Sequence, residues 1–389
     1  MYRRNLLAGL VALAAAQVAC QQTTTQTLRI AALKGVLPPQ VLSAFRAALQ
    51  TPVSLKVNTQ INASVLFHQL QQWQTAAEQS QNQPSFNPFS SSRLATLADW
   101  VSLNDYWLVS AIQQELISPL VVETIPQWSD LPKPWQRLLK RDGKGFPSRS
   151  GAVWATPYRW GNLVIVYANR SFERLGWQPT QWQDLWKAEL AGRISLPNHP
   201  RLVLGIVLKS LGYSANDAAP ESHQDFENAL NTLSEQVKVY ASDDYIQPLI
   251  QGDTWLAVGW STDIRPIVAQ YRQLKAIVPD PGTLLSADLW VKPRSNDTDK
   301  DAISLTELDS SWLSHWWKPE TLTLVSLFSQ GLSPLLITPE ALTETDELSP
   351  TNLLLPSAAQ LQQSDFLEPL PSESIERYTQ LWKRLRGSE

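Results

Sequence analysis

Residues 151–214 alternate between two kinds of sequence pattern, and this alternation restricts the fold more than any other feature of the chain. Runs rich in β-branched and aromatic residues are typical of strands, whereas apolar residues at helical spacing after a capping residue are typical of helices. The patterns predict strands at 153–157, 162–167 and 192–196, a turn at 158–161, and helices at 171–175, 181–186 and 201–211. Such a succession of strand, turn and helix N-terminus is where open α/β sheets bind small ligands.

The same alternation continues on both sides of this stretch. Before it, strands are predicted at 28–33, 53–57 and 98–101, and helices at 40–49, 64–74 and 111–117. After it, strands are predicted at 237–240, 255–260, 274–278 and 287–291, and helices at 226–236, 245–251, 264–271, 312–329 and 372–386. Strands that alternate with helices predict parallel α/β lobes. Two polar segments, 75–93 and 292–301, are expected to be surface insertions.

Residues 1–19 have the features of an export signal. Arg3 and Arg4 precede an apolar run at 6–18, which is shorter than the ~20 residues that a membrane-spanning helix needs. The arginine pair fits a twin-arginine signal and an ordinary secretory signal about equally well. Cys20 is the only cysteine and follows small residues, which predicts a lipoprotein. We expect a periplasmic protein with a tether at 20–27, held at the membrane by a lipid on Cys20 alone.

Charge and residue chemistry argue against several classes of function. Removing residues 1–19 takes two of the 32 basic residues and none of the 36 acidic ones, so the mature net charge is −6. That charge argues against nucleic acid or an anionic membrane surface as a partner. The four histidines lack metal-ligand spacing, and no phosphate-binding, dinucleotide-binding or nucleophile motif is present. We therefore expect no enzyme activity, no cofactor and no metal.

Aromatic residues give the positive signal, because the chain has 17 tryptophans. Most of them must belong to the core. Aromatic faces also attract cationic nitrogen and cover methylene chains. A carboxylate at the end of such a slot would fix an ammonium group by a charge-assisted hydrogen bond. Aromatic walls with acids at the ends are the physical requirement for recognising a polyamine.

Five stretches together resemble the spermidine/putrescine-binding proteins of bacterial polyamine importers. They are PYRWGNLVIVYAN, WQDLWKAELAGRISLPN, LGYS, QPLIQGDTWLAVGWSTDIRPIVAQ and SADLWVKP, and the likeness covers roughly residues 28–292. The resemblance implies a type II periplasmic-binding-protein fold with two α/β lobes, each a mixed sheet flanked by helices, and a ligand cleft between them. Lobe 1 is expected at 28–158 with 288–340, and lobe 2 at 159–287 with 341–389. We expect a monomer that binds a polyamine-like small molecule and docks on an ABC permease.

The resemblance also implies the residues that contact the ligand. Trp260 matches a stacking tryptophan, Asp288 matches a carboxylate that holds an ammonium group, and Tyr106 matches a tyrosine of the cleft. Asn104 stands where the family has a hydroxyl ligand, and His199 stands where it has an acid.

Several positions depart from the family. A polar pair and a leucine replace three acids, a serine replaces a second stacking tryptophan, and the first loop gains a lysine; these residues are Asn198, His199, Leu202, Ser286 and Lys34. Asp288 is the one ligand carboxylate that is retained, so we hypothesise a site for one ammonium, with Asp105 and Asp263 as the next acids to consider. The alternatives are another small cationic or neutral polar solute, a non-transport lipoprotein that reuses the fold, or a cofactor-carrying exported oxidoreductase.

Overall fold

The structure is a computed structural model that describes residues 25–82, 98–294, 302–343 and 348–387. The predicted signal peptide, Cys20 and most of the predicted tether lie outside the described residues, as do large parts of both predicted insertions. None of the helices in the described part of the chain is long and apolar enough to cross a membrane.

One large mixed sheet organises the described residues. Its strands run in the order β2-β1-β3-β12-β7-β10-β8-β9, with β11 paired to β7 and with β4 and β13 paired to β12. The strands are β1 (Gln26–Leu33), β2 (Val53–Gln60), β3 (Trp100–Asn104), β4 (Ile117–Ser118), β7 (Thr156–Ala168), β8 (Ile194–Pro197), β9 (Val237–Ala241), β10 (Leu256–Trp260), β11 (Leu274–Ile277), β12 (Leu284–Pro293) and β13 (Asp365–Phe366). A separate pair joins β5 (Lys140–Arg141) to β6 (Ala152–Val153).

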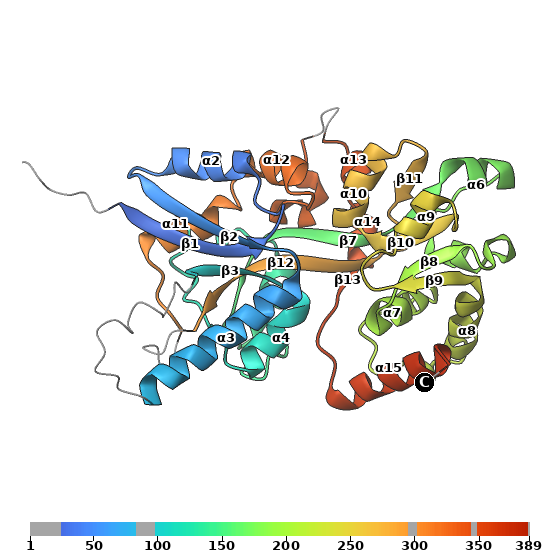
Figure 1. The fold of residues 1–389 in the computed structure, drawn as a ribbon, viewed down its shortest axis with the longest axis horizontal. Coiled ribbons are helices and arrows are strands. Elements are labelled where there is room, and N and C mark those ends of the chain that lie inside the picture. Colours follow the sequence, from blue (N-terminus) through green and yellow to red (C-terminus); the bar gives the residue numbers. More distant parts are fainter. Residues whose placement is uncertain (1–24, 83–97, 295–301, 344–347, 388–389) are drawn as a thin grey trace, which may run out of the picture.

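Two long antiparallel strands, β7 and β12, run side by side through the middle of the molecule (Figure 1). On one side of them lie β1, β2 and β3, and on the other lie β8, β9 and β10. Their pairing shifts register between Asp288 and Leu289, which marks a β-bulge or irregularity. The two strands therefore connect the halves of the fold, and the irregularity lies in the middle of that connection.

The predicted turn at 158–161 is wrong, because β7 is continuous over 13 residues. Its large side chains find partners on both faces of the sheet: Tyr158 stacks on Trp290 with ring centroids 4.3 Å apart, and Trp160 donates from Nε1 to the carbonyl oxygen of Ser333 at 2.8 Å. A Cβ on Gly161 would come within 3.0 Å of the Ser261 side chain. Close packing, not a turn, accounts for that glycine.

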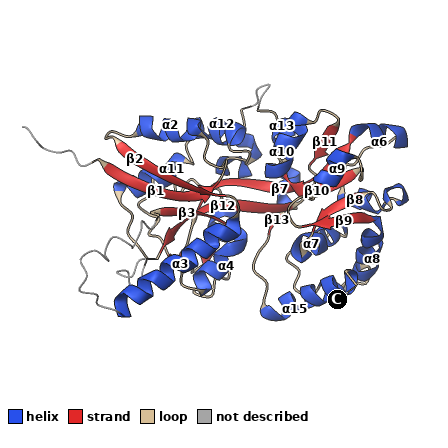
Figure 2. Ribbon diagram, in the orientation of Figure 1, coloured by secondary structure: helices blue, strands red, loops and turns tan. Residues whose placement is uncertain are grey.

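Helices cover both faces of the sheet in each half (Figure 2). They are α2 (Pro39–Ala48), α3 (Ala63–Asn82), α4 (Asp105–Gln113), α5 (Lys133–Leu139), α6 (Asn169–Leu175), α7 (Pro200–Ser210), α8 (Phe226–Gln236), α9 (Gln247–Gln251), α10 (Ser261–Gln270), α11 (Glu307–His315), α12 (Pro319–Phe328), α13 (Pro350–Leu353), α14 (Ala358–Gln362) and α15 (Ser372–Leu385). The predicted helix at 181–186 is a 3-10 helix, Trp182–Trp186.

The predicted long helix at 312–329 is in fact two helices. Thr306 caps α11 by accepting a hydrogen bond from the backbone N–H of Asp309, and Pro319 is the first residue of α12. Proline is tolerated in a first helical turn but not in a helix interior, which explains the break.

Buried apolar side chains form two large cores and a smaller one. The first joins residues of 28–160 to residues of 285–355 and holds most of the fully buried tryptophans. The second joins residues of 163–284 to Leu370, Tyr378 and Leu381. The third lies under α10 and β11. Each half of the sheet thus has its own core, while the division of the chain between the predicted lobes stays a prediction.

Candidate functional site

A cavity of about 230 Å³ lies where α4, α7, β10 and β12 approach one another. All five residues predicted to contact a ligand line it: Asn104, Tyr106, His199, Trp260 and Asp288. The other lining residues are Leu33, Ala63, Asp105, Trp107, Leu202, Leu285, Ser286 and Leu367. Four surface hollows of about 700, 550, 540 and 360 Å³ are larger, but Phe366 is the one aromatic residue among the residues that line them, and it lies in the smallest of the four. Chemistry rather than size therefore selects the candidate site.

Strand register places the polar residues of the cavity. Asp288 of β12 lies opposite Asn104 of β3 on one side and opposite Arg159 of β7 on the other. Asn104 also caps α4, because its Oδ1 accepts the backbone N–H of Tyr106 at 3.1 Å. Its Nδ2 donates to Oγ of Ser286 at 2.8 Å. The sequence Asn-Asp-Tyr thus ends a strand, starts a helix and presents three side chains to the cavity.

Arg159 contacts Asp288 directly. Nε of Arg159 donates to Oδ2 of Asp288 at 2.6 Å, and Nη1 donates to the carbonyl oxygen of Ser329 at 2.5 Å. The two residues are 8% and 9% exposed, so this is a buried ion pair. Sequence reasoning placed Arg159 in a turn and missed this role. The register of β7 against β12 was the signal that would have revealed it.

Asp105 is a second acid at the cavity and is almost fully buried. Its Oδ1 accepts hydrogen bonds from Oγ of Ser286 at 3.1 Å and from the backbone N–H of Ala287 at 3.2 Å. Its Oδ2 is buried without a partner among the described residues. Burial raises the pKa of Asp105 to about 7, although these hydrogen bonds and the charge of Arg141 act in the opposite direction.

Asp263, the other acid considered from the sequence, is not among the lining residues. Its Oδ2 accepts a hydrogen bond from the Tyr245 hydroxyl at 2.5 Å. The same hydroxyl accepts the backbone N–H of Trp260 at 3.4 Å. Asp263 therefore lies one hydrogen-bond partner away from a cavity residue and supports the end of β10.

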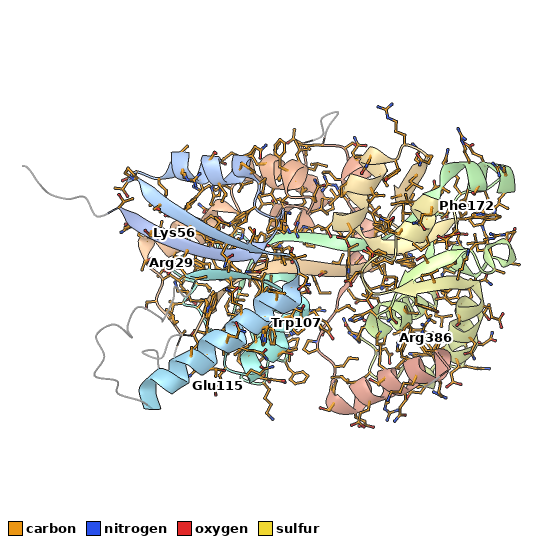
Figure 3. All side chains as sticks on the ribbon, in the orientation of Figure 1. Arg29, Lys56, Trp107, Glu115, Phe172 and Arg386 are labelled. Atoms are coloured by element: carbon orange, nitrogen blue, oxygen red, sulfur yellow. The ribbon has the colours of Figure 1, made fainter. Side chains whose placement is uncertain are left out.

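Aromatic side chains form the apolar walls. Tyr106 is 49% exposed and meets His199 edge-on, with ring centroids 5.5 Å apart. Trp107, labelled in Figure 3, lies where α3 and α4 meet and stacks on Phe67 at 4.6 Å. Trp260 is half-buried at the junction of β10 and α10. Tyr106 and Trp260 come from different halves of the fold, so the walls belong to both halves.

His199 and Lys34, which replace acidic or neutral residues of the family, add little positive charge to the cavity. Burial lowers the pKa of His199, and the nearby charge of Arg201 lowers it further, so the imidazole is neutral at pH 7. Lys34 is exposed and is not among the lining residues. The described residues also contain no group of three or more His, Cys, Asp or Glu side chains that could hold a metal ion. Aromatic walls beside acidic side chains suit a small organic solute.

Comparisons with known proteins agree with this architecture. A family model described as bacterial extracellular solute-binding protein matches residues 96–311, more than half of the chain. The chain is 26% identical over 133 residues to the putrescine/cadaverine-binding protein of Pseudomonas aeruginosa, a match that covers 32% of this chain and only 38% of that protein. It is 22% identical over 292 residues to spermidine/putrescine-binding periplasmic protein 1 of Haemophilus influenzae, covering 75% of each.

A solved structure shows a similar fold. It is that of the spermidine/putrescine ABC transporter substrate-binding protein of Streptococcus pneumoniae. The TM-score is 0.71 and the identity 20%, with 93% of this chain and 99% of that chain covered. The likeness confirms the predicted two-lobed α/β fold.

Proposed function

Because the chain belongs to the family of bacterial extracellular solute-binding proteins, we propose that it binds an aliphatic amine of the polyamine type in this cavity and delivers it to an ABC permease. Two of its relatives are named for binding spermidine, putrescine or cadaverine. The observation that supports an amine most directly is the lining itself, which combines the acids Asp105 and Asp288 with the aromatic side chains Tyr106, Trp107 and Trp260.

Each candidate residue has a part in holding an amine. Trp260 and Tyr106 would cover the methylene chain and attract the cationic nitrogen with their ring faces. Asp288 would accept a charge-assisted hydrogen bond from an ammonium group, and Asn104 would accept another hydrogen bond from the same ammonium group. His199, being neutral, would border the chain without repelling the charge.

The size of the cavity favours a short ligand. A volume of about 230 Å³ holds roughly eight water molecules at ~30 Å³ each. We expect a chain of putrescine length to suit this space better than the longer spermidine. Closure of the lobes over the ligand would bring the two aromatic walls together and exclude water from the ammonium group.

Calorimetry and thermal unfolding with a panel of ligands test this function. The panel holds butylamine, putrescine, cadaverine and spermidine, with a sugar and an acidic amino acid as controls. An amine at a hundred times its Kd should raise the free energy of unfolding by ~2.7 kcal/mol. If none of the amines binds while a control ligand does, the chain carries a different solute.

A further inference from the structure

One oxygen of Asp288 already binds a cation that belongs to the protein. Arg159 reaches it with Nε at 2.6 Å, from the position directly opposite in the β7–β12 pair. Both residues are at least nine-tenths buried. A guanidinium stays charged under such conditions because of its high intrinsic pKa. The negative charge of Asp288 is therefore balanced before any ligand enters.

The charges around the cavity leave little for a ligand with two ammonium groups. Among the described residues that line it, Asp105 and Asp288 are the acids, and His199 is the one titratable base. Burial opposes ionisation of Asp105, whose pKa lies at about 7. Arg159 offsets Asp288. The protein thus supplies at most about one net negative charge to the space where a ligand would lie.

We propose that Arg159 sets the charge of the ligand: by occupying Oδ2 of Asp288 as an internal cation, it restricts the cavity to a ligand with a single ammonium group. The inference rests on the proposed function, since it concerns an amine in the same cavity. The ammonium would be held by the remaining oxygen of Asp288 together with Asn104 and Ser286. A second ammonium would be repelled by the guanidinium, because the two carry like charges. This repulsion would exclude a diamine from the cavity.

Arg159 also has a structural contact, which the experiment must separate from its charge. Its Nη1 donates to the carbonyl oxygen of Ser329, in the turn that follows α12. Arg265 binds the same region, donating to the carbonyl oxygens of Ser326, Gln330 and Gly331 at 2.7, 3.1 and 3.4 Å. No ion pair to Arg265 is found in the described part of the chain. Arg265→Gln therefore removes a similar support of the turn and leaves the Arg159–Asp288 pair in place.

Butylamine and putrescine form a matched pair of probes, because they share a carbon chain and differ by one ammonium group. Calorimetry on the wild type should show butylamine binding more tightly, by at least about tenfold. In Arg159→Gln putrescine should gain at least about tenfold relative to butylamine, because its second ammonium no longer meets a guanidinium as a like charge. Arg265→Gln should keep the wild-type ratio.

Each other result has a definite meaning. Wild-type protein that binds putrescine as tightly as butylamine overturns the inference and leaves the proposed function standing, and this measurement needs no variant to fold. An equal change of ratio in Arg265→Gln and Arg159→Gln also overturns it, since the turn after α12 would then be the cause. If butylamine, putrescine and spermidine all fail to bind the wild type, the proposed function itself fails.

Discussion

Asp105 is a buried acid whose charge the fold opposes. Its pKa rises from the ordinary 3.8 to about 7 through burial, with a smaller contribution from the charge of Asp288. Between these values the folded chain binds more protons than the unfolded chain, so this group makes the free energy of unfolding fall as the pH rises from about 4 to about 7. Asp105→Asn should remove that loss. In urea unfolding, the free energy of unfolding of the variant should exceed that of the wild type by up to about 4 kcal/mol at pH 8 and match it near pH 4. The same difference between the two proteins at both pH values would contradict the raised pKa of Asp105.

The same carboxyl group couples ligand binding to pH. A bound ammonium favours the ionised form of Asp105, so we expect amine binding to release a proton and to strengthen as the pH rises through about 7. His199 would add to this trend only in more acidic solution, because burial lowers its pKa. Calorimetry in two buffers of different ionisation enthalpy measures the proton release directly. Binding with no proton release at pH 7 would exclude this coupling.

Trp260 is expected to contribute binding energy rather than stability. It is half-buried, lines the cavity and packs only against the edge of the second core, so truncation removes a ring face from the cavity and little of the core. Trp260→Ala should weaken amine binding by about 2 kcal/mol. Trp255→Ala is the matched control, because Trp255 is also half-buried but faces Arg193 instead of the cavity. If Trp255→Ala weakens amine binding as much as Trp260→Ala does, Trp260 is an ordinary packing residue.

At the scale of secondary-structure elements, the end of β10 depends on a close contact. A Cβ on Gly259 would come within 2.2 Å of the Tyr245 ring, whose hydroxyl group binds Asp263 and the backbone of Trp260. Gly259→Ala should therefore displace Tyr245 and destabilise the protein by about 1–3 kcal/mol. Thermal unfolding measures this, with Gly143→Ala as the control, because a Cβ there meets nothing within 4 Å. Equal stability of the two variants would contradict the contact.

The elements were largely predictable because most of them are local. Apolar spacing places a helix at 226–236, and α8 has those bounds. The failures came from distant partners and from one proline. Tyr158 and Trp160 suggested a turn, yet they are held in a continuous strand by Trp290 and Ser333, more than a hundred residues away. The apolar pattern at 312–329 ran across Pro319, which begins a second helix.

The candidate site was predictable where the family resemblance reached it. Asn104, Tyr106, His199, Trp260 and Asp288 come from distant parts of the chain and line one cavity. Residue type alone could not reveal how their charges are balanced. The partner of Asp288 depends on strand register, and the ionisation of Asp105 depends on burial. Both are properties of the tertiary structure.

At the scale of the whole molecule, the sequence predicts that the location of the protein depends on Cys20, which lies outside the described residues. We propose that this cysteine carries a lipid, which anchors the folded lobes to the membrane in the periplasm. Cys20→Ser should move the protein from the membrane fraction to the soluble fraction while ligand binding stays unchanged. Since Cys20 is the only cysteine, the substitution removes no other thiol. A wild-type protein that is already fully soluble would exclude the anchor.

The register shift beside Asp288 has a mechanical consequence. Irregular pairing of this kind bends and twists a strand locally, and here it lies in the two strands that join the halves of the molecule. A rotation of one half against the other would therefore be concentrated next to the carboxylate that is paired with Arg159. If Arg159 sets the charge of the ligand as proposed, the position at which the molecule bends lies next to it. Bending of the protein and filling of its cavity should then be directly coupled.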